Sequence, residues 1–199
     1  MQTEGSAQTF VFFGIVGSGK GTQVKLLMDY LKQKDGRECL YAGTGEGFRK
    51  LTETKSFSAE LVRECLDAGK LVPDFLTNAI FVGMLSEGLA PEKNLVADGY
   101  PRTIAQSEIF ETAMDFYKRK GIKIIYIEVG KEEALKRNLL RGRHDDTEEG
   151  LAKRFDEYVN KVVPAMNYFN GKDGYTVYTV NGEQSVEAVH KDIINAISQ

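Results

Sequence analysis

A glycine-rich segment directly after an apolar run is the feature that most limits how this chain can fold. The segment GIVGSGKGTQ, Gly14–Gln23, holds four glycines and one lysine and follows the apolar segment Thr9–Phe13. Glycine is unfavourable inside regular elements, but it lets a backbone turn tightly and approach a ligand closely. A helical pattern begins near Lys20, so its positive dipole end and the loop N–H groups meet at one place. The order strand, glycine loop, lysine, helix predicts a polyphosphate site.

The residue types in this loop indicate the contacts that each would make. Backbone N–H groups are expected to hold phosphate oxygens, Lys20 to add a positive charge, and Thr22 to reach a phosphate or Mg²⁺. The common pattern has serine or threonine directly after the lysine, whereas here Gly21 intervenes. A plain glycine-rich turn is the alternative, and the flanking strand and helix disfavour it. The residues expected to bind are Gly17, Ser18, Gly19, Lys20, Gly21 and Thr22.

Five short apolar segments are typical of strands, and helical patterns separate them. The expected strands are Thr9–Gly14, Glu38–Ala42, Asn94–Asp98, Ile122–Val129 and Tyr175–Val180. The expected helices are Lys20–Lys34, Ala59–Ala68, Asp74–Gly88, Thr103–Arg119, Glu132–Leu140, Asp146–Phe169 and Ser185–Ile197. Continuous apolar strands alternating with helices predict an α/β fold with three α/β/α layers around a five-stranded parallel sheet.

The chain length of 199 residues predicts a single domain, 1–199, with excursions from its core. The interval between Ala42 and Asn94 contains helical patterns and no expected strand, which is too long for a simple crossover. We therefore expect a small helical excursion over 43–72. A shorter one is expected over the charged segment 141–147, and the core is left with 9–42, 73–140 and 146–199.

Composition narrows the class of protein. The net charge is −3, from 26 basic and 29 acidic residues, with no run of like charge, so neither nucleic acid nor a membrane surface is an expected partner. Cys39 and Cys65 are far apart and are expected to be buried thiols rather than a disulfide or metal ligands. The first residues lack a secretion signal, and no segment has the roughly 18 apolar residues of a spanning helix. A cytoplasmic protein is expected.

The loop itself resembles that of the adenylate kinase family of nucleoside monophosphate kinases. The family loop reads GxPGSGKGTQ, and Gly14–Gln23 matches it except that Val16 replaces the proline. The similarity runs from Thr9 to about Val189, nearly the whole chain. It implies a P-loop fold and reversible phosphoryl transfer from ATP to AMP, giving two ADP, with Mg²⁺ as cofactor and small nucleotides as partners of a monomer.

The segment DGYPRT, Asp98–Thr103, is similar to the family signature DGFPR and follows an expected strand. The resemblance implies that Arg102 grips the α-phosphate of the acceptor and that Asp98 binds a water of the Mg²⁺ shell. A plain Asp–Gly–x–Pro turn is the alternative. The implied acceptor-binding residues of this segment are Gly99, Tyr100, Pro101 and Arg102.

Two further segments resemble the acceptor-binding part of the family. In GTGEGFRK, the family segment STGDxxR is matched by Thr44, Gly45 and Arg49, while Gly43 replaces the serine and Glu46 the aspartate. A helix cap with a surface arginine is the alternative. In AGKLVPD, the resemblance implies that backbone lines the acceptor ribose and base at Lys70, Leu71 and Val72, although an ordinary helix-to-helix turn explains the composition equally well.

Gln106 lies one helical turn beyond Arg102, on the same face. Its amide offers a donor and an acceptor together, which the N6 amino group and N1 of adenine require. In the family, glutamine here accompanies AMP and asparagine accompanies pyrimidine monophosphates. A solvent-exposed glutamine is the alternative.

The basic residues near the middle of the chain resemble the family pattern RxDD…R. The resemblance places Arg143 and Arg154 on the transferring phosphates, Arg137 against the donor adenine and Arg141 on a donor phosphate. Surface ion pairs are the alternative for any one of them. Near the end of the chain, Gly182 and Gln184 resemble positions that touch the donor ribose and base, although a strand, an Asn–Gly turn and a helix would account for them.

The segment 141–147 leaves hardly any room for the inserted lid that some family members carry there. Because it contains no cysteine, we expect a very short lid without structural zinc.

The motifs together give the expected catalytic residues, which are Lys20, Asp98, Arg102, Arg143 and Arg154. Two other functions stay open: a UMP/CMP-type kinase, and a non-catalytic P-loop protein that senses adenine nucleotides.

Overall fold

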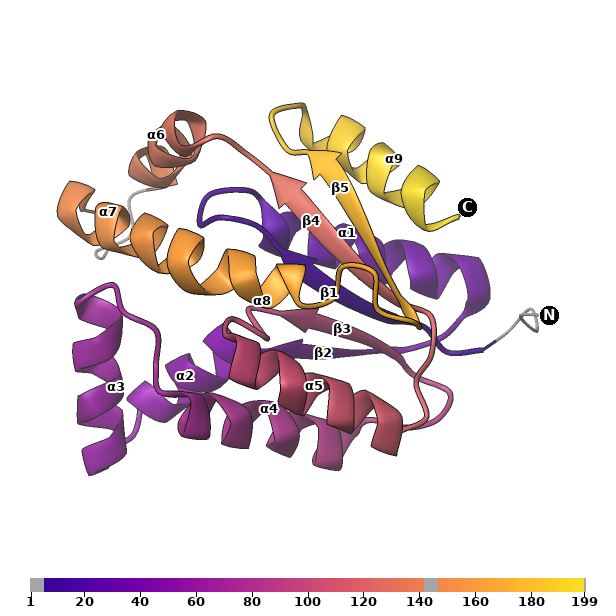
Figure 1. Cartoon of the computed structure of the whole chain (residues 1–199), viewed down its shortest axis with the longest axis horizontal. Coiled ribbons are helices and arrows are strands. Elements are labelled where there is room, and N and C mark those ends of the chain that lie inside the picture. The colour runs from indigo at the N-terminus through magenta and orange to yellow at the C-terminus, as the bar shows by residue number, and fades with distance from the viewer. Residues whose placement is uncertain (1–5, 142–146, 199) are drawn as a thin grey trace.

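The computed structural model describes residues 6–141 and 147–198. A parallel sheet forms the centre of the molecule (Figure 1), with its strands in the order β2-β3-β1-β4-β5. The strands are β1 (Thr9–Phe13), β2 (Cys39–Gly43), β3 (Asn94–Asp98), β4 (Ile122–Glu128) and β5 (Tyr175–Asn181). Each expected strand is present within one residue at either end, and the expected α/β fold with a five-stranded parallel sheet is confirmed.

Helices cover both faces of this sheet (Figure 1). They are α1 (Lys20–Asp35), α2 (Thr44–Thr52), α3 (Phe57–Asp67), α4 (Asp74–Gly88), α5 (Ile104–Phe116), α6 (Lys131–Arg141), α7 (Glu148–Glu157), α8 (Val163–Asn167) and α9 (Val186–Ile197). Helix α2 is not among the helices expected from the sequence. The sequence predicts one helix over 146–169, where a π-helical segment, η1 (Tyr158–Val162), joins α7 to α8.

Side-chain caps set the start of several helices. A hydroxyl oxygen accepts a hydrogen bond from the N–H three residues further on at α3, α5, α7 and α9. Such a bond satisfies one of the backbone donors that a helix start leaves without a partner. The capping residues are Ser56, Thr103, Thr147 and Ser185. By contrast, Gly19 precedes α1 and has no side chain that could cap it.

Two apolar cores lie on opposite faces of the sheet. All five residues of β1 are buried; Phe10 and Phe12 pack in the core under α1 and α9, and Val11 and Phe13 pack in the core under α4, α5 and α8. A strand buried on both faces has to be continuously apolar, which is why β1 reads as an unbroken run.

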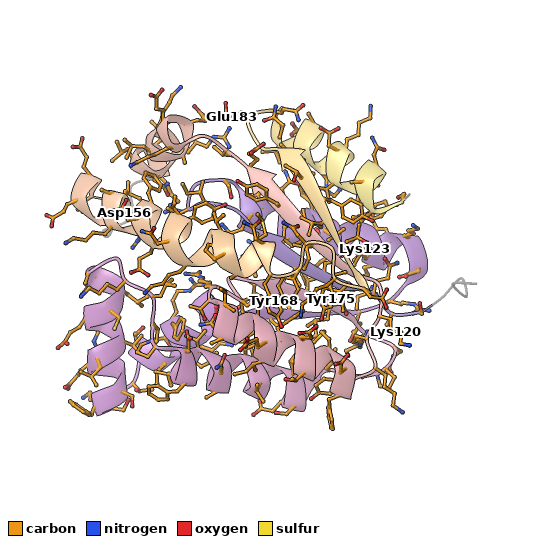
Figure 2. All side chains as sticks on the ribbon, in the orientation of Figure 1. Lys120, Lys123, Asp156, Tyr168, Tyr175 and Glu183 are labelled. Carbon is orange, nitrogen blue, oxygen red and sulfur yellow. The ribbon has the colours of Figure 1, made fainter. Side chains whose placement is uncertain are left out.

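Aromatic rings fill the second core. The Tyr100 ring stacks on Phe81 at 3.9 Å between centroids, and Phe110 meets Phe169 edge to face at 5.9 Å. Tyr168 and Tyr175 both contact the Phe169 ring, and they lie next to each other near the end of α8 (Figure 2). These contacts fix the loop after β3, because Tyr100 belongs to that loop.

The carboxyl ends of the strands face the side of the molecule where α2, α3, α6 and α7 lie (Figure 1). There α2 and α3 leave the sheet and have a small apolar cluster of their own, formed by Phe48, Val62 and Val72. Within the two described ranges, none of the helices has the length and hydropathy that crossing a membrane would require.

Candidate functional site

The glycine loop leaves the carboxyl end of β1 and leads directly into α1. Gly17 and Gly19 have φ angles of 88° and 87°, in the left-handed region that favours glycine. The N–H of Ser18 donates to the carbonyl of Ile15, which closes the turn at 3.1 Å. The Thr22 N–H donates to the Gly19 carbonyl at 3.0 Å, and because no side chain caps α1, the N–H groups of Lys20 and Gly21 are available to an anion at the loop.

A buried asparagine holds the loop against α6. A Cβ at position 17 would lie 2.4 Å from Nδ2 of Asn138 and 2.7 Å from the carbonyl oxygen of Ala134. Asn138 has 0% of its surface exposed, and its Nδ2 donates to the Val16 carbonyl at 2.9 Å and to the Ala134 carbonyl at 2.7 Å. The sequence analysis does not identify Asn138, since a lone asparagine on a helix carries no motif.

Lys20 is the centre of the charged part of the site. Its Nζ donates to the carbonyls of Gly14 and Ile15, at 2.5 and 3.1 Å. Burial lowers the pKa of Lys20 to about 8, against the opposing effect of the Asp98 carboxylate, and the charges of Arg102 and Arg141 lower it further. Three expected site residues, Asp98, Arg102 and Arg141, therefore lie within electrostatic reach of Lys20.

The turn after β3 presents Arg102 on a rigid support. The Gly99 carbonyl accepts hydrogen bonds from Thr44 Oγ1 and from Arg102 Nε, both at 2.9 Å. Tyr100 is 1% exposed and donates to Asn78 Oδ1 at 2.8 Å, and Pro101 is buried beside it. Both residues thus shape the turn from the core, whereas the sequence analysis lists them among the acceptor-binding residues.

Arg102 itself is strongly influenced by its surroundings. Burial lowers its pKa, the Asp98 carboxylate opposes that change, and the charge of Arg154 adds to it. Because an arginine stays protonated under all ordinary conditions, the half-buried Arg102 keeps a positive charge that can bind an anion. Arg154, on α7, therefore lies within electrostatic reach of Arg102.

Gln106 lies next to this turn but is not a surface residue. It is 1% exposed; its Oε1 accepts from the Arg102 N–H at 2.8 Å, and its Nε2 donates to Asp74 Oδ1 at 2.7 Å. The alternative of a solvent-exposed glutamine is therefore wrong. Asp74 also accepts from the Thr103 hydroxyl at 2.9 Å, so this carboxylate fixes which end of the amide is nitrogen.

The expected acceptor-binding residues of 43–72 differ in exposure. Thr44 and Val72 are buried, Gly45 and Leu71 are half-buried, and Arg49 and Lys70 are exposed. These six residues surround the end of β2 and the turn that follows α3.

A glycine in the middle of α2 has a packing reason. A Cβ at position 47 would lie 2.4 Å from Cγ2 of Ile80, so Gly47 allows α2 to approach α4 closely. The glycine that is unusual for a helix is therefore required by tertiary packing, which the sequence alone does not reveal.

The expected donor-side residues meet between α6 and β5. Arg137 donates to Glu133 Oε1 at 2.7 Å and to the Gly182 carbonyl at 2.9 Å. The N–H of Gly130 donates to Glu183 Oε1 at 2.7 Å, and Figure 2 shows Glu183 at this end of β5. Gln184 is exposed and donates to Asp192 Oδ2 at 2.9 Å.

The segment expected to form the lid is only partly described. α6 ends at Arg141 and α7 begins at Glu148, and Arg143 lies outside the described residues. Near α7, a Cβ at Gly69 would lie 2.9 Å from the Gly150 carbonyl, so the turn after α3 approaches α7 closely.

The side chains near Lys20 fit a magnesium ion held with phosphates. Asp98 supplies one carboxylate and the exposed Thr22 one hydroxyl, and Mg²⁺ typically takes one or two carboxylates together with phosphate oxygens and water. Among the described residues, no group of three or more His, Cys, Asp or Glu side chains is arranged to hold a metal without such a ligand.

Fold and site together define a class of protein. The central strand of a parallel sheet is followed by a glycine loop with left-handed residues and by a half-buried lysine within electrostatic reach of two arginines, which is the arrangement of a P-loop phosphotransferase.

Comparison with known proteins narrows this class. The family model "Adenylate kinase" matches residues 12–174. The chain is similar to "Adenylate kinase" of Thermosipho africanus, with 32% identity over 94% of this chain and 98% of the relative. It is also similar to "Adenylate kinase" of Oenococcus oeni, with 30% identity over 90% of this chain and 93% of the relative. The chain belongs to the adenylate kinase family.

Gly17 and Gly19 have the same backbone conformation, so alanine variants of the two distinguish the cost of backbone strain from the cost of close packing in the loop. Gly19→Ala should destabilise the fold by about 1–2 kcal/mol, because only the left-handed conformation opposes a Cβ there. Gly17→Ala should destabilise it by clearly more, because its Cβ also meets Asn138 and Ala134. Urea unfolding of both variants measures the difference, and equal losses would contradict the close packing of the loop on α6.

Proposed function

We propose that this chain transfers the γ-phosphoryl group of Mg·ATP reversibly to AMP, giving two ADP. The observation that carries this proposal is the mutual electrostatic influence of Lys20, Asp98 and Arg102 at the carboxyl ends of the strands. These groups come from the glycine loop and from the loop after β3, so a donor on the first and an acceptor on the second would face each other across a short gap.

The donor is held by the glycine loop in this proposal. The N–H groups of Gly17–Thr22 bind its β- and γ-phosphates, and the Lys20 ammonium exchanges its loop carbonyls for phosphate oxygens. Arg141 adds charge on the same side, and its influence on the pKa of Lys20 supports this role. Arg137, Gly182 and Gln184 border the donor base, which their contacts between α6 and β5 support.

The acceptor lies on the turn after β3 and on α2. The Arg102 guanidinium binds its α-phosphate through two parallel hydrogen bonds, and the exposed Arg49 reaches the same phosphate from α2. Backbone at Thr44, Gly45, Gly99 and Lys70–Val72 borders its ribose and base. Arg154 and Arg143 extend from the α7 side toward the moving phosphoryl group.

Gln106 is proposed to read the adenine base of the acceptor. Each of its two polar atoms keeps one hydrogen-bonding position beyond those used with Arg102 and Asp74. Because Gln106 is 1% exposed, base reading requires a local shift that uncovers this amide without turning it over.

The chemistry needs no side chain as nucleophile. An oxygen of the acceptor phosphate attacks the γ-phosphorus, and the bond from that phosphorus to the β-phosphate oxygen breaks, so ADP leaves as ADP forms. Lys20 and the arginines neutralise the charge that spreads over the transferred group, which is where such sites gain most of their rate. Mg²⁺, which adenylate kinases generally use with ATP, would neutralise the β- and γ-phosphates beside Asp98 and Thr22.

Closure of the excursion 43–72 and of the short lid 141–147 is proposed to exclude water, which would otherwise accept the phosphoryl group. The close approach of Gly69 to the Gly150 carbonyl supports contact between the excursion and α7, the helix that follows the lid. The division into core, excursion and lid, the monomeric state and the cytoplasmic location stay predictions from the sequence.

Acceptor preference is the direct test of this proposal. With Mg·ATP as donor, AMP should be phosphorylated with a kcat/KM at least about a hundredfold above those for UMP, CMP and GMP, because a mismatched base leaves the two remaining hydrogen-bonding positions of the Gln106 amide without partners. Lys20→Ala should lower kcat by about 10²–10³-fold, as the loss of one charge-stabilising donor does. A preference for UMP or CMP would favour the pyrimidine kinase, and binding without turnover would favour the nucleotide sensor.

The lowered pKa of Lys20 predicts a pH dependence of ATP binding. In the free protein the pKa is about 8, and a bound polyphosphate raises it, so binding above pH 8 takes up a proton. ATP affinity should be nearly constant below pH 7 and fall by up to about tenfold per pH unit above 8. Titration calorimetry in buffers of different ionisation heat measures both quantities.

Lys20→Arg is the matched control for this measurement, because a guanidinium stays charged over the whole range. Its binding curve should be flat between pH 7 and 9. A wild-type curve as flat as that of the arginine variant would show that the Lys20 ammonium is not the group that titrates.

A further inference from the structure

Gly43 and Tyr41 form an arrangement that none of the sequence motifs predicts. Gly43 ends β2 with φ −98° and ψ 101°, an extended conformation that any residue adopts. Yet a Cβ at this position would lie 2.3 Å from both Cζ and the hydroxyl oxygen of Tyr41. Glycine is therefore required here by the Tyr41 ring and not by the backbone.

The register of the sheet explains why the Tyr41 ring lies beside Gly43 and Asp98. Tyr41 pairs with Val96 and Gly43 pairs with Asp98, so Tyr41, Gly43 and Asp98 lie on one face of neighbouring strands. The ring leans over Gly43 along the strand, and the Tyr41 hydroxyl donates to Asp98 Oδ2 at 3.3 Å. Within the described part of the chain, this is the one hydrogen bond that reaches the Asp98 carboxylate.

Asp98 needs such a restraint because two cations lie near it. The charge of Asp98 raises the pKa of both Lys20 and Arg102. Over the described residues, however, no ion pair within 4 Å joins Asp98 to either of them. A carboxylate free to rotate would pair with one of these cations and neutralise a charge that the phosphates need. The Tyr41 hydroxyl reaches this carboxylate from β2, which lies on the side of β3 opposite to β1 and its glycine loop.

We propose that Tyr41 is a positioning residue that orients the Asp98 carboxylate, and that Gly43 is the space that admits its ring. The inference rests on the proposed phosphoryl transfer. Burial, together with the Asp98 charge, raises the pKa of Tyr41 to about 12, so its hydroxyl keeps the proton that it donates at any physiological pH. The remaining lone pairs of Asp98 would then be available to the water shell of a magnesium ion.

Tyr41→Phe removes the hydroxyl and keeps the ring. It should lower kcat about tenfold while the KM for AMP changes less than twofold and the urea midpoint is unchanged. It should also reduce about tenfold the gain in ATP affinity that Mg²⁺ provides, measured by calorimetric titration of ATP with and without Mg²⁺. Tyr178→Phe, a half-buried tyrosine on the other edge strand, is the matched control and should leave all four quantities unchanged.

A double-mutant cycle tests the role of Gly43. Gly43→Ser should reproduce the losses of Tyr41→Phe, because the serine Cβ displaces the ring. The variant should fold, since the ring can move into an adjacent cavity of about 250 Å³ that Tyr41 and Gly43 line. In a Tyr41→Ala background, where no ring remains, Gly43→Ser should change neither kcat nor the magnesium effect by more than twofold.

Several results would overturn this inference. They are a Tyr41→Phe variant with the wild-type kcat and magnesium effect, a variant that loses only stability, or full additivity of Gly43→Ser and Tyr41→Ala. The proposed function fails separately, if the wild-type chain transfers no phosphoryl group to AMP. The magnesium effect on ATP binding would then still report whether Tyr41 orients Asp98.

Discussion

A buried ammonium group at the start of α1 is the constraint on which the rest of this structure depends. Burial disfavours the charged form of Lys20, whose ammonium group donates hydrogen bonds to two carbonyls of its own loop. Such a charge is tolerated only if the surroundings supply acceptors, and a polyphosphate supplies more of them than the loop does. Three features keep the loop open so that phosphate oxygens can replace the loop carbonyls as partners of Lys20. They are the left-handed glycines, the uncapped start of α1 and the Asn138 contacts.

The order of the strands brings the second half of the site to the first. β1 is central, and β3 lies directly beside it, so the loops after these two strands emerge next to each other. The turn after β3 is anchored in the second core by the stacked Tyr100 and Phe81 rings. Arg102 is thus held near the glycine loop by a core contact, and its position is set by packing as much as by charge.

Much of this could be predicted from the sequence, because local patterns determine it. The apolar runs predict β3 and α4 with their bounds as observed, and the glycine loop with its lysine predicts the phosphate side of the site. Helix α2 is not predicted, since Gly45 and Gly47 weaken its pattern and only packing against Ile80 explains the second. The π-helical segment is not predicted either, because its residues continue a helical pattern.

The remaining differences involve residues that are far apart in the sequence. Gln106 is buried because Asp74, on another helix, binds its amide, and no local pattern contains that partner. Asn138 and Tyr41 act through single contacts with Val16 and Asp98, which a motif search does not detect. Arg143 lies outside the described residues and stays a prediction.

Counting the nucleotides bound at saturation tests the central claim most directly, because Lys20 and Arg102 are proposed to hold two nucleotides that face each other. Equilibrium titration with ADP should give two molecules bound per chain. A dinucleotide with two adenosines joined by a polyphosphate should bind once and displace both. Saturation at a single ADP, or failure of that dinucleotide to compete, would contradict the account.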